Sequence, residues 1–354
     1  LTVIGAALKN YQGVIAPVTS HINTHEAGAI ELTGHKVISV SSPDGKIRPE
    51  QVERRCKAYT ADAHRTHLVQ PGMVYISQTT EVGTLYTKAE VKALHDVCKK
   101  YGLLLFLDGA RLGYAVESPG NDLKLEDLPH LCDVFTIGGT KQGALFGEAA
   151  VIVDEELKRE FPYHIKQRGA LLAKGWLLGI QYETLFTDNL YFRLARHAAD
   201  LAVKMHKGFK EAGFDFLHNH ETNQQLPIFT QTQFDKLKEK GFYFDHFADM
   251  KDGRIVTRFC TSWATDPANV DKLLEANIPV LGGEVVSWDT KGILSYNYDG
   301  WYCDFFPEEA LSDYVCRSVR KAKECLYAYK VDEVLFVVGF DPDFSKEKYQ
   351  HLIN

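Results

Sequence analysis

The chain has 354 residues, 45% of them hydrophobic and 25% charged, the composition of an ordinary globular protein with one large domain or two smaller ones. Forty basic against 47 acidic residues give a formal net charge of −7, which argues against nucleic acid or an anionic membrane as the main partner. No apolar run is long enough to span a bilayer, no signal-peptide pattern opens the sequence, and the seven cysteines form no Cys-x-x-Cys pair, so we expect a cytoplasmic protein.

The first stretches carry two patterns. "LTVIGAALKNYQG" predicts an amphipathic helix that ends at Gly13, and because it is already under way at residue 1 we expect further sequence upstream. "SHINTHEAGA" places His21 and His25 four residues apart with Glu26 behind them. On a helix both histidines would share one face, as zinc-binding histidines must, but the metalloprotease signature keeps its glutamate between the histidines. A metal site and a packed or solvated pair both stay open on the residues alone.

Residues 36 to 150 alternate short apolar strands with capped helices. The helix after residue 87 has Thr87 and Glu90 at capping-box spacing and Gly102 at its C-terminal stop. Apolar runs without alternation, separated by helices, predict an α/β fold with a mainly parallel sheet covered on both faces. In such sheets the chemistry gathers at the carboxyl ends of the strands. The expected strands are "KVISV" (36–40), "MVYIS" (73–77), "LLLFLD" (103–108), "DVFTIGG" (133–139) and "AAVIV" (149–153).

The remainder of the chain divides into two further segments with different sequence patterns. A long helix at 190–212 leads to a smaller α+β stretch with strands near 224–229 and 254–263 and a helix that begins at Asp266. After about residue 276 the sequence becomes rich in Gly, Trp and Tyr and alternates like β-hairpins, before a helix near 308–328 and a strand at 334–339. We therefore expect three parts: a large domain (1–189), a small α+β domain (190–275) and a C-terminal α+β module (276–354).

Two stretches carry the chemistry, "LFLDGARLGYA" and "DVFTIGGTKQGALFGEA". One strand ends at Asp108, and the next leads into a glycine-rich turn with Lys141. This pair suits pyridoxal phosphate, because a lysine amine joins its aldehyde while a carboxylate keeps the pyridine nitrogen protonated. The spacing of "GGTK" is not that of a nucleotide-binding P-loop. Taken alone, the aspartate could equally form a turn and the lysine could be a solvated loop residue.

From residue 1 to about 272 the chain resembles the low-specificity threonine aldolase and β-eliminating lyase family, which has the aspartate-aminotransferase fold. Six blocks carry the resemblance in order: "SHINTHEAGA", "VYISQTTEVGTLY", "FLDGARLGYA", "FTIGGTKQGALFGEA", "KQRGALLAKG" and "RFCTSWAT". The resemblance implies that the large domain binds pyridoxal phosphate, with Lys141 as the Schiff-base lysine and Asp108 as the partner of the ring nitrogen. Arg111 and Thr140 are implied as further cofactor contacts.

The same resemblance assigns roles around the substrate. Arg111 and Arg258 are implied to grip the substrate carboxylate, for which a planar guanidinium is well suited. His21 matches a histidine that lies flat on the cofactor ring, so no metal is expected, and His25 and Glu26 support the turn. Lys174 or Arg168 either reaches the cofactor phosphate, across a subunit boundary, or is ordinary surface charge.

The implied reaction is the cleavage of a β-hydroxy-α-amino acid such as threonine to glycine and an aldehyde, in a homo-oligomer with shared active sites. One alternative is a β-eliminating lyase or aminotransferase on the same cofactor. Another is a catalytically impaired remnant whose working part is the C-terminal module. Products formed from a panel of amino acids separate the aldolase from the β-eliminating lyase or aminotransferase. The colour of a bound cofactor separates both enzymes from the impaired remnant.

The sequence also departs from the family. The family's Gly/Thr-rich phosphate-binding turn would lie upstream of residue 1, and if the chain is complete as given we expect weaker cofactor binding and activity. Thr80 stands where many members carry a histidine near the substrate hydroxyl, and a threonine is no base near neutral pH. The last eighty or so residues resemble small immunity proteins that neutralise bacterial polymorphic toxins, which suggests a fused protein-binding module or a chimeric sequence. Trp288, Trp301 and Tyr302 suit either a binding face or a small core.

Overall fold

The computed structural model describes residues 1–275, 295–297 and 300–302. These residues belong to two compact units, of which the first comprises Leu1–Trp263 and the second begins at Ala264. The helix expected near 308–328 and the strand expected at 334–339 lie outside the described residues. The three-part division of the sequence stays a prediction.

The first unit contains a six-stranded sheet with strand order β2-β1-β3-β4-β5-β6. The pairs β1–β2, β1–β3, β3–β4 and β4–β5 are parallel, and β6 joins the edge antiparallel to β5. The predicted α/β fold with a mainly parallel sheet is therefore confirmed. The strands are β1 (Gln12–Pro17), β2 (Val37–Val40), β3 (Gln70–Ser77), β4 (Leu104–Asp108), β5 (Val134–Ile137) and β6 (Ala149–Ile152).

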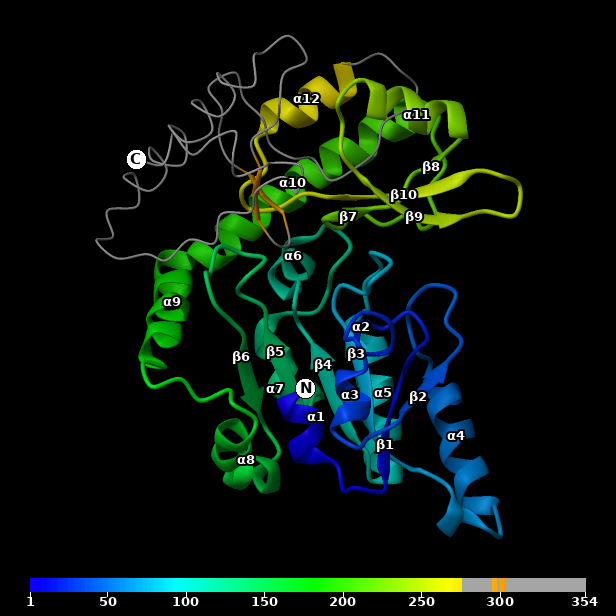
Figure 1. Cartoon of the computed structure of the whole chain (residues 1–354), viewed down its shortest axis with the longest axis vertical. Helices are drawn as coiled ribbons and strands as arrows, with labels where there is room; N and C mark the ends of the chain where they lie inside the picture. Colours follow the sequence, from blue (N-terminus) through cyan, green and yellow to red (C-terminus); the bar gives the residue numbers. More distant parts are fainter. Residues whose placement is uncertain (276–294, 298–299, 303–354) are drawn as a thin grey trace, which may run out of the picture. The chain divides into compact units, whose positions relative to one another are not determined.

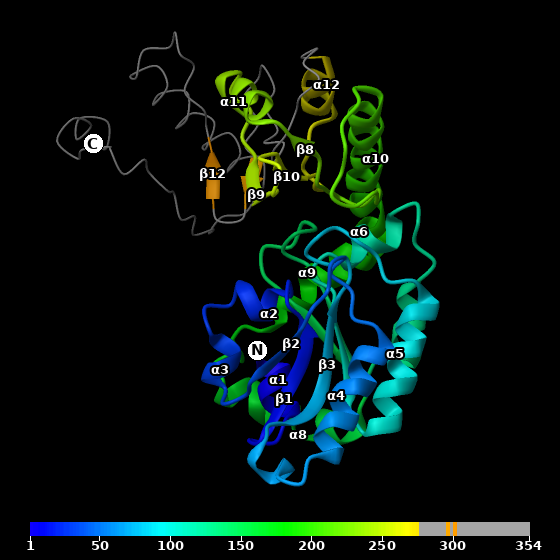
Figure 2. The same cartoon turned by 90° about the vertical axis from the view of Figure 1, so that its right-hand side faces the viewer.

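Helices cover both faces of this sheet, as Figures 1 and 2 show. Helices α4 and α5 lie against one face, and α1 and α8 lie against the other. The helices of the first unit are α1 (Thr2–Ala7), α2 (His21–Thr24), α3 (Ala29–Leu32), α4 (Pro49–Ala61), α5 (Lys88–Tyr101), α6 (Leu112–Glu117), α7 (Leu128–Leu131), α8 (Glu155–Gln167), α9 (Trp176–Phe186), α10 (Leu190–Glu211) and α11 (Gln231–Glu239), with 3₁₀ turns at Arg65–His67, Leu125–Asp127 and Thr187–Asn189.

The alternation of strand side chains decides which face each residue serves. On β3, Val74 and Ile76 join the apolar cluster beneath α4 and α5, whereas Met73 and Tyr75 join the cluster beneath α1 and α8. Because alternate residues of a strand point to opposite faces, Asp108, two positions after Phe106 on β4, belongs to the α1 and α8 face. The register of β3 and β4 sets Ser77 beside Asp108 where both strands end.

Helix α5 has the ends that its sequence predicts. The Thr87 hydroxyl accepts a hydrogen bond from the Glu90 amide at 3.2 Å, and the Glu90 carboxylate accepts one from the Thr87 amide at 2.9 Å. Gly102 ends the helix in the left-handed conformation, with φ +66°. This capping box fixes where the turn after β3 passes into the helix.

The prediction of a single helix ending at Gly13 is wrong. Helix α1 ends at Ala7, and Gly13 lies inside β1, between β2 and β3. A Cβ on Gly13 would lie 2.7 Å from the Lys36 carbonyl oxygen and 2.8 Å from a methyl group of Val69. The glycine therefore permits close packing of neighbouring chain segments rather than stopping a helix.

A smaller antiparallel sheet follows α10. It contains β7 (Gln224–Gln225), β8 (Ile228–Phe229), β9 (Asp245–Asp249) and β10 (Ile255–Cys260), each of the others paired with β10. The strand expected at 224–229 is two short strands, and β9 and α11 were not predicted. The apolar cover includes the closely packed rings of Phe209, Phe229 and Phe259.

The described part of the second unit consists of a helix and a hairpin. Helix α12 (Pro267–Glu275) begins after Asp266, whose Oδ1 accepts a hydrogen bond from the Ala268 amide at 2.9 Å. Strands β11 (Ser295–Asn297) and β12 (Gly300–Tyr302) pair antiparallel, as the hairpin-like alternation predicted. Trp288 lies outside the described residues.

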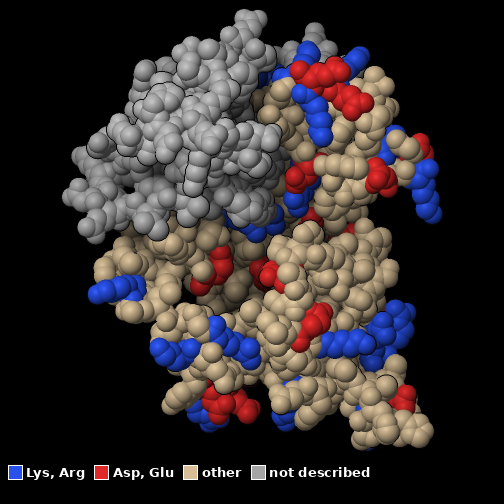
Figure 3. Space-filling view, in the orientation of Figure 1, with Lys and Arg blue, Asp and Glu red and all other residues tan. Residues whose placement is uncertain are grey.

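Two surface properties bear on possible partners. No helix within the described ranges is long and apolar enough to cross a membrane. On the face shown in Figure 3, Lys and Arg side chains are interspersed with Asp and Glu over the described part of the chain. The formal charge of −7 is thus not gathered into a single acidic patch on that face.

Candidate active site

A cavity of about 690 Å³ lies on the α1 and α8 face of the sheet, where β3 and β4 end. Its walls come from α1, α2, the ends of the strands and α8. Four of the predicted site residues line it together: His21, Asp108, Arg111 and Lys141. The strand order explains the meeting, because the carboxyl ends of neighbouring parallel strands share one edge of the sheet.

Asp108 is fixed by three donors, from β3, from the turn after β4 and from β5. The Tyr75 hydroxyl donates to Oδ2, the Ala110 amide donates to Oδ1 at 2.9 Å, and the Thr136 hydroxyl lies 3.4 Å from Oδ1. Burial raises the pKa of Tyr75, so its hydroxyl keeps the proton that it donates. The carboxylate is therefore held in one orientation at the end of β4.

Lys141 lies partly buried in the turn between β5 and β6. Burial, and then the positive charge of Arg111, lower the pKa of Lys141 to about 8. Asp108 and Glu148 oppose this shift, because their negative charges favour the protonated amine. A lysine with this pKa has far more unprotonated amine near neutral pH than an ordinary lysine, and the unprotonated amine is the nucleophile.

Several side chains hold the turn that carries Lys141. Glu148 accepts hydrogen bonds from the Gly139 amide at 2.7 Å and from the Thr140 hydroxyl at 3.0 Å. The Tyr114 hydroxyl donates to the carbonyl oxygen of Lys141. Sequence reasoning missed Tyr75, Tyr114 and Glu148, although all three lie inside the matching blocks, because nothing local distinguishes them from core or surface residues.

His21 and His25 each have a ring nitrogen engaged by a neighbouring oxygen. His21 Nδ1 lies 2.6 Å from Glu26 Oε1, and His25 Nδ1 lies 2.6 Å from Thr24 Oγ1. The two rings stack with their centroids 5.2 Å apart. Within the described residues no three His, Cys, Asp or Glu side chains group as metal ligands do.

Two other predicted site residues lie outside the lining of the cavity, within the part of the chain that the structure describes. Thr140 binds Glu148, next to Lys141. Arg258, on β10, donates from Nε to Asp245 at 3.0 Å. Its positive charge contributes to lowering the pKa of His25, after burial and the charge of His21, so Arg258 lies within electrostatic reach of the stacked histidines.

The stretch that contains Arg168 and Lys174 lies after α8. Arg168 donates from Nη2 to the Gly5 carbonyl oxygen of α1 at 2.8 Å, and Lys174 is exposed. Helix α1 lines the cavity, so Arg168 lies behind one of its walls.

Residues 1–232 match the family model described as beta-eliminating lyase. Two proteins named low specificity L-threonine aldolase, from a Pseudomonas strain and from Pseudomonas aeruginosa, are each 30% identical over 273 residues, which cover 76% of this chain and 77% of theirs. The chain belongs to the beta-eliminating lyase family. The resemblance predicted from the sequence is thereby confirmed.

Solved structures agree with the family. The threonine aldolase of Leishmania major is 44% identical, with a TM-score of 0.74 over 78% of this chain and 79% of that one. An aspartate aminotransferase of Thermus thermophilus, 16% identical, has a TM-score of 0.55 over 79% of this chain and 72% of its own, and shows the fold alone. Residues 263–340 match the family model described as Immunity protein 40, which agrees with the resemblance stated for the last eighty or so residues.

Pyridoxal phosphate, on which the threonine aldolases and the aminotransferases of this fold depend, is the cofactor of this family. The residues present fit it. An aldehyde needs an amine that loses its proton near neutral pH, which Lys141 supplies, and a pyridinium needs a fixed carboxylate, which Asp108 supplies. Both line the same cavity.

Proposed function

We propose that this protein cleaves a β-hydroxy-α-amino acid of the threonine type to glycine and an aldehyde, with pyridoxal phosphate as its cofactor. One observation carries the proposal: Lys141, with its pKa of about 8, and Asp108, whose carboxylate accepts three hydrogen bonds, line the same cavity. Identity of 30% and 44% to proteins named threonine aldolase supports the substrate class.

Each residue has a task that its chemistry suits. The cofactor, when bound, supplies a ring that accepts the electron pair released at the substrate's Cα. Lys141 would hold the cofactor's aldehyde through Nζ, and Asp108 would hold the proton on its ring nitrogen. His21 would lie against the ring face, and Arg111 would bind the substrate carboxylate, with Arg258 as its second guanidinium. Orienting the carboxylate also decides which bond at Cα breaks.

Thr140 and the turn around it have a supporting task. With its hydroxyl bound to Glu148, Thr140 keeps the backbone before Lys141 in place. We propose it as a cofactor contact through this turn. Glu148, through its charge, also keeps the pKa of Lys141 from falling further.

An absorbance titration tests the proposal. The protein mixed with pyridoxal phosphate should develop the violet, near-visible absorbance of a lysine-bound cofactor, and borohydride should abolish it. Lys141→Ala should stay colourless. The matched control is Lys92→Ala, which removes an exposed lysine on α5 paired with Asp96 and should leave the colour unchanged. A wild-type protein that remains colourless would contradict the proposal and favour the remnant hypothesis.

The substrate panel separates the two reactions on the same cofactor. Threonine, serine and a keto-acid acceptor should be tested with detection of acetaldehyde, pyruvate and ammonia. Acetaldehyde with glycine supports the aldolase, whereas pyruvate with ammonia supports β-elimination.

We also propose a homo-oligomer. Large apolar side chains on and beside α9 are exposed on the single chain: Leu171, Leu172, Trp176, Leu177 and Ile180. An exposed apolar face of this kind is typical of a protein contact, and it adjoins the stretch with Arg168 and Lys174. Sedimentation should give a species larger than one chain, and a monomer at all concentrations would contradict shared active sites. A protein partner for residues 276–354 and a cytoplasmic location stay predictions.

A further inference from the structure

The turn after β3 presents alternate residues to the cavity. Ser77, Thr79 and Glu81 line it. Thr80, between them, is fully buried, and its Oγ1 lies 2.7 Å from Thr84 Oγ1 and accepts a hydrogen bond from the Thr84 amide at 3.1 Å. The Thr80 hydroxyl is therefore used inside the turn and does not face a substrate.

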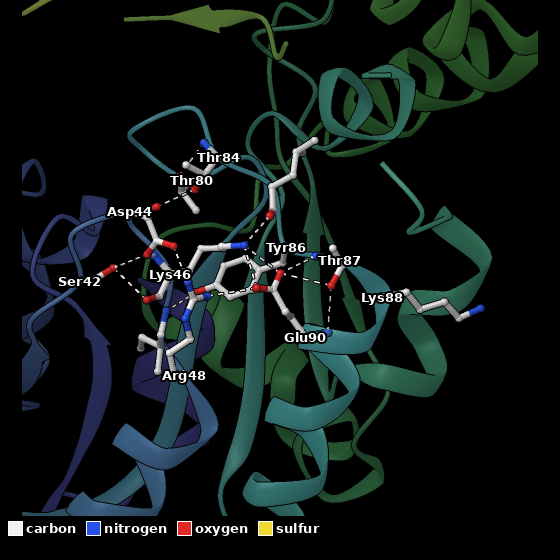
Figure 4. Close-up of polar contacts among 12 residues, drawn as sticks. Ser42, Asp44, Lys46, Arg48, Thr80, Thr84, Tyr86, Thr87, Lys88 and Glu90 are labelled. Atoms are coloured by element: carbon white, nitrogen blue, oxygen red, sulfur yellow. Dashed lines mark hydrogen bonds and ion pairs between the residues drawn. The ribbon is translucent and has the colours of Figure 1, made fainter. Parts of the chain in front are cut away.

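A polar network joins this turn to neighbouring loops and to the start of α5, as Figure 4 shows. The Thr84 hydroxyl donates to the carbonyl oxygen of Asp44 at 2.7 Å. The Asp44 carboxylate accepts from Arg48 at 2.5 Å, and Arg48 and Lys46 both donate to Glu90, at 3.1 and 2.8 Å. Two loops and the start of α5 are thus joined into one rigid support.

A residue of the smaller sheet holds the turn on another side. Gln224 donates from Nε2 to the Thr79 hydroxyl at 3.0 Å and to the Thr80 carbonyl oxygen at 2.9 Å. A turn bound on both sides keeps its cavity-facing groups in fixed positions, which is what a reacting group requires.

Glu81 stands in this fixed turn with one oxygen bound and the other not. Its Oε1 accepts from the Ser77 hydroxyl at 2.7 Å and from the His21 amide at 2.9 Å. Its Oε2 is buried and has no hydrogen-bond partner within the described residues. Buried polar atoms almost always have a hydrogen-bond partner, so an exception in a cavity wall indicates an atom that can bond to a ligand in the cavity.

The other carboxylates on the cavity wall already have partners. Glu26 binds His21, Asp108 is bonded by three donors, and Glu148 holds Gly139 and Thr140. Among the carboxylates that line the cavity in the described chain, only Glu81 has a buried oxygen without a hydrogen-bond partner. That oxygen is an acceptor without a donor.

We propose that Glu81 is the acid–base residue for the substrate's β-hydroxyl, with Oε2 as the atom that takes the proton. This inference rests on the proposed function. As the Cα–Cβ bond breaks, the O–H bonding electrons form the aldehyde's carbonyl bond and the hydroxyl proton passes to Oε2. The electron pair of the broken bond stays with Cα, which takes up one proton to become glycine. One proton leaves oxygen and one joins carbon, so the reaction needs no oxidant or reductant.

The surroundings of Glu81 predict a pH dependence. Burial, and to a lesser degree the charge of Asp108 on β4, raise the pKa of Glu81, while the bonds from Ser77 and the His21 amide oppose the rise. The Tyr75 hydroxyl on β3 also faces it. A base must be ionised, so cleavage should fall as the pH drops through a value above the ordinary 4.5 of a glutamate.

Glu81→Gln tests the inference through two reactions of one protein. Cleavage of threonine should fall about 10²- to 10⁴-fold in kcat, with little change in KM and without the acidic limb of the pH profile. Exchange of glycine's α-hydrogen in heavy water, followed by NMR, involves no β-hydroxyl and should stay within about threefold of wild type. The absorbance of the bound cofactor should be unchanged. Glu81→Asp should recover part of the cleavage.

The matched control is Thr80→Ser, which changes the neighbouring residue but keeps its buried hydroxyl and the bonds to Thr84. With active sites counted by bound cofactor, its kcat should stay within about threefold of wild type, and a hundredfold loss would overturn the inference, because any change in the turn would then impair cleavage as much as the loss of the Glu81 carboxylate. Normal cleavage by Glu81→Gln would overturn this inference and leave the proposed function standing. A parallel loss of cleavage, exchange and colour would also overturn only this inference, because it would indicate a structural role for Glu81. A wild-type protein that exchanges glycine's hydrogen but cleaves no β-hydroxy substrate overturns the proposed function together with this inference.

Discussion

The turn after β5 and the turn after β3 line the same cavity but are built in different ways. The first is glycine-rich and is held mainly at its backbone, by Tyr114 on the Lys141 carbonyl and by Glu148 on the Gly139 amide. The second is held by a network of side chains that extends through Asp44 and Arg48 to Glu90. A backbone-held turn leaves a sequence motif, whereas a side-chain network leaves its evidence in residues far apart in the chain.

That difference decides what the sequence could reveal. "GGTK" marks Lys141 locally, and the strand before Asp108 marks the carboxylate. Nothing local marks Glu81, because its distinction is that Oε2 stays unbonded after Thr80 and Ser77 have found their partners. This contrast between the two turns bears on function only if residues of both turns contribute to the reaction.

After Glu81, the largest effect on cleavage should come from Asp108, which lies between the two turns. Asp108→Asn keeps the size of the side chain but removes the charge that would stabilise the ring's proton, so cleavage should fall about 10²- to 10³-fold. The measurement is kcat per bound cofactor. Asp96→Asn, an exposed carboxylate on α5, is the control and should change nothing. If Asp108→Asn retains wild-type kcat, the Asp108 carboxylate is not the partner of the ring nitrogen.

The next effect concerns stability and pH at Lys141. A pKa of about 8 in the folded chain against an ordinary 10.5 means that burying the charged amine costs stability below pH 8, on the order of 3 kcal/mol. Between pH 8 and 10.5 the unfolded chain binds a proton that the folded chain does not, so stability rises with pH and the cost disappears.

Lys141→Met removes this titration. Without cofactor, the variant should be more stable than wild type at pH 7, and the difference should vanish as the pH approaches 10.5. Urea unfolding at several pH values measures it. Parallel stability curves for the two proteins would mean that the pKa of Lys141 is ordinary.

A smaller pair of effects separates the two kinds of turn. Lys46→Met removes a half-buried cation that binds Glu90 and the Leu85 carbonyl oxygen, and should lower the free energy of unfolding by about 1–3 kcal/mol. Tyr114→Phe removes one donor to the turn of Lys141 and should cost about 0.5–1.5 kcal/mol. Chemical unfolding compares them. A larger loss of unfolding free energy in Tyr114→Phe than in Lys46→Met would mean that the turn of Lys141 depends more on its side-chain contacts than the turn after β3 does.

The sheet was largely predictable, and its exceptions have physical reasons. Long apolar strands such as 103–108 are evident because both of their faces are covered. Strand β1 was missed because it follows α1 after a few residues and contains Gly13, which also suits a helix end. Strand β9 was missed because "DHFAD" is polar, as suits a strand with exposed side chains.

For the site, the sequence led to residues at strand ends, and the structure places His21, Asp108, Arg111 and Lys141 on one cavity. Their roles stay predictions. Arg258 could not be placed from the sequence, because its ion pair with Asp245 depends on the pairing of β9 with β10. The side chains that hold the site, such as Tyr75, are visible once the register of β3 and β4 is known.

One measurement tests the central claim most directly. The protein is incubated with pyridoxal phosphate, reduced with borohydride and digested, and mass spectrometry locates the lysine that carries the cofactor. The account predicts that the modified peptide contains Lys141, in the stretch "GGTKQGALFGEA". A cofactor found on another lysine, or on none, would contradict it.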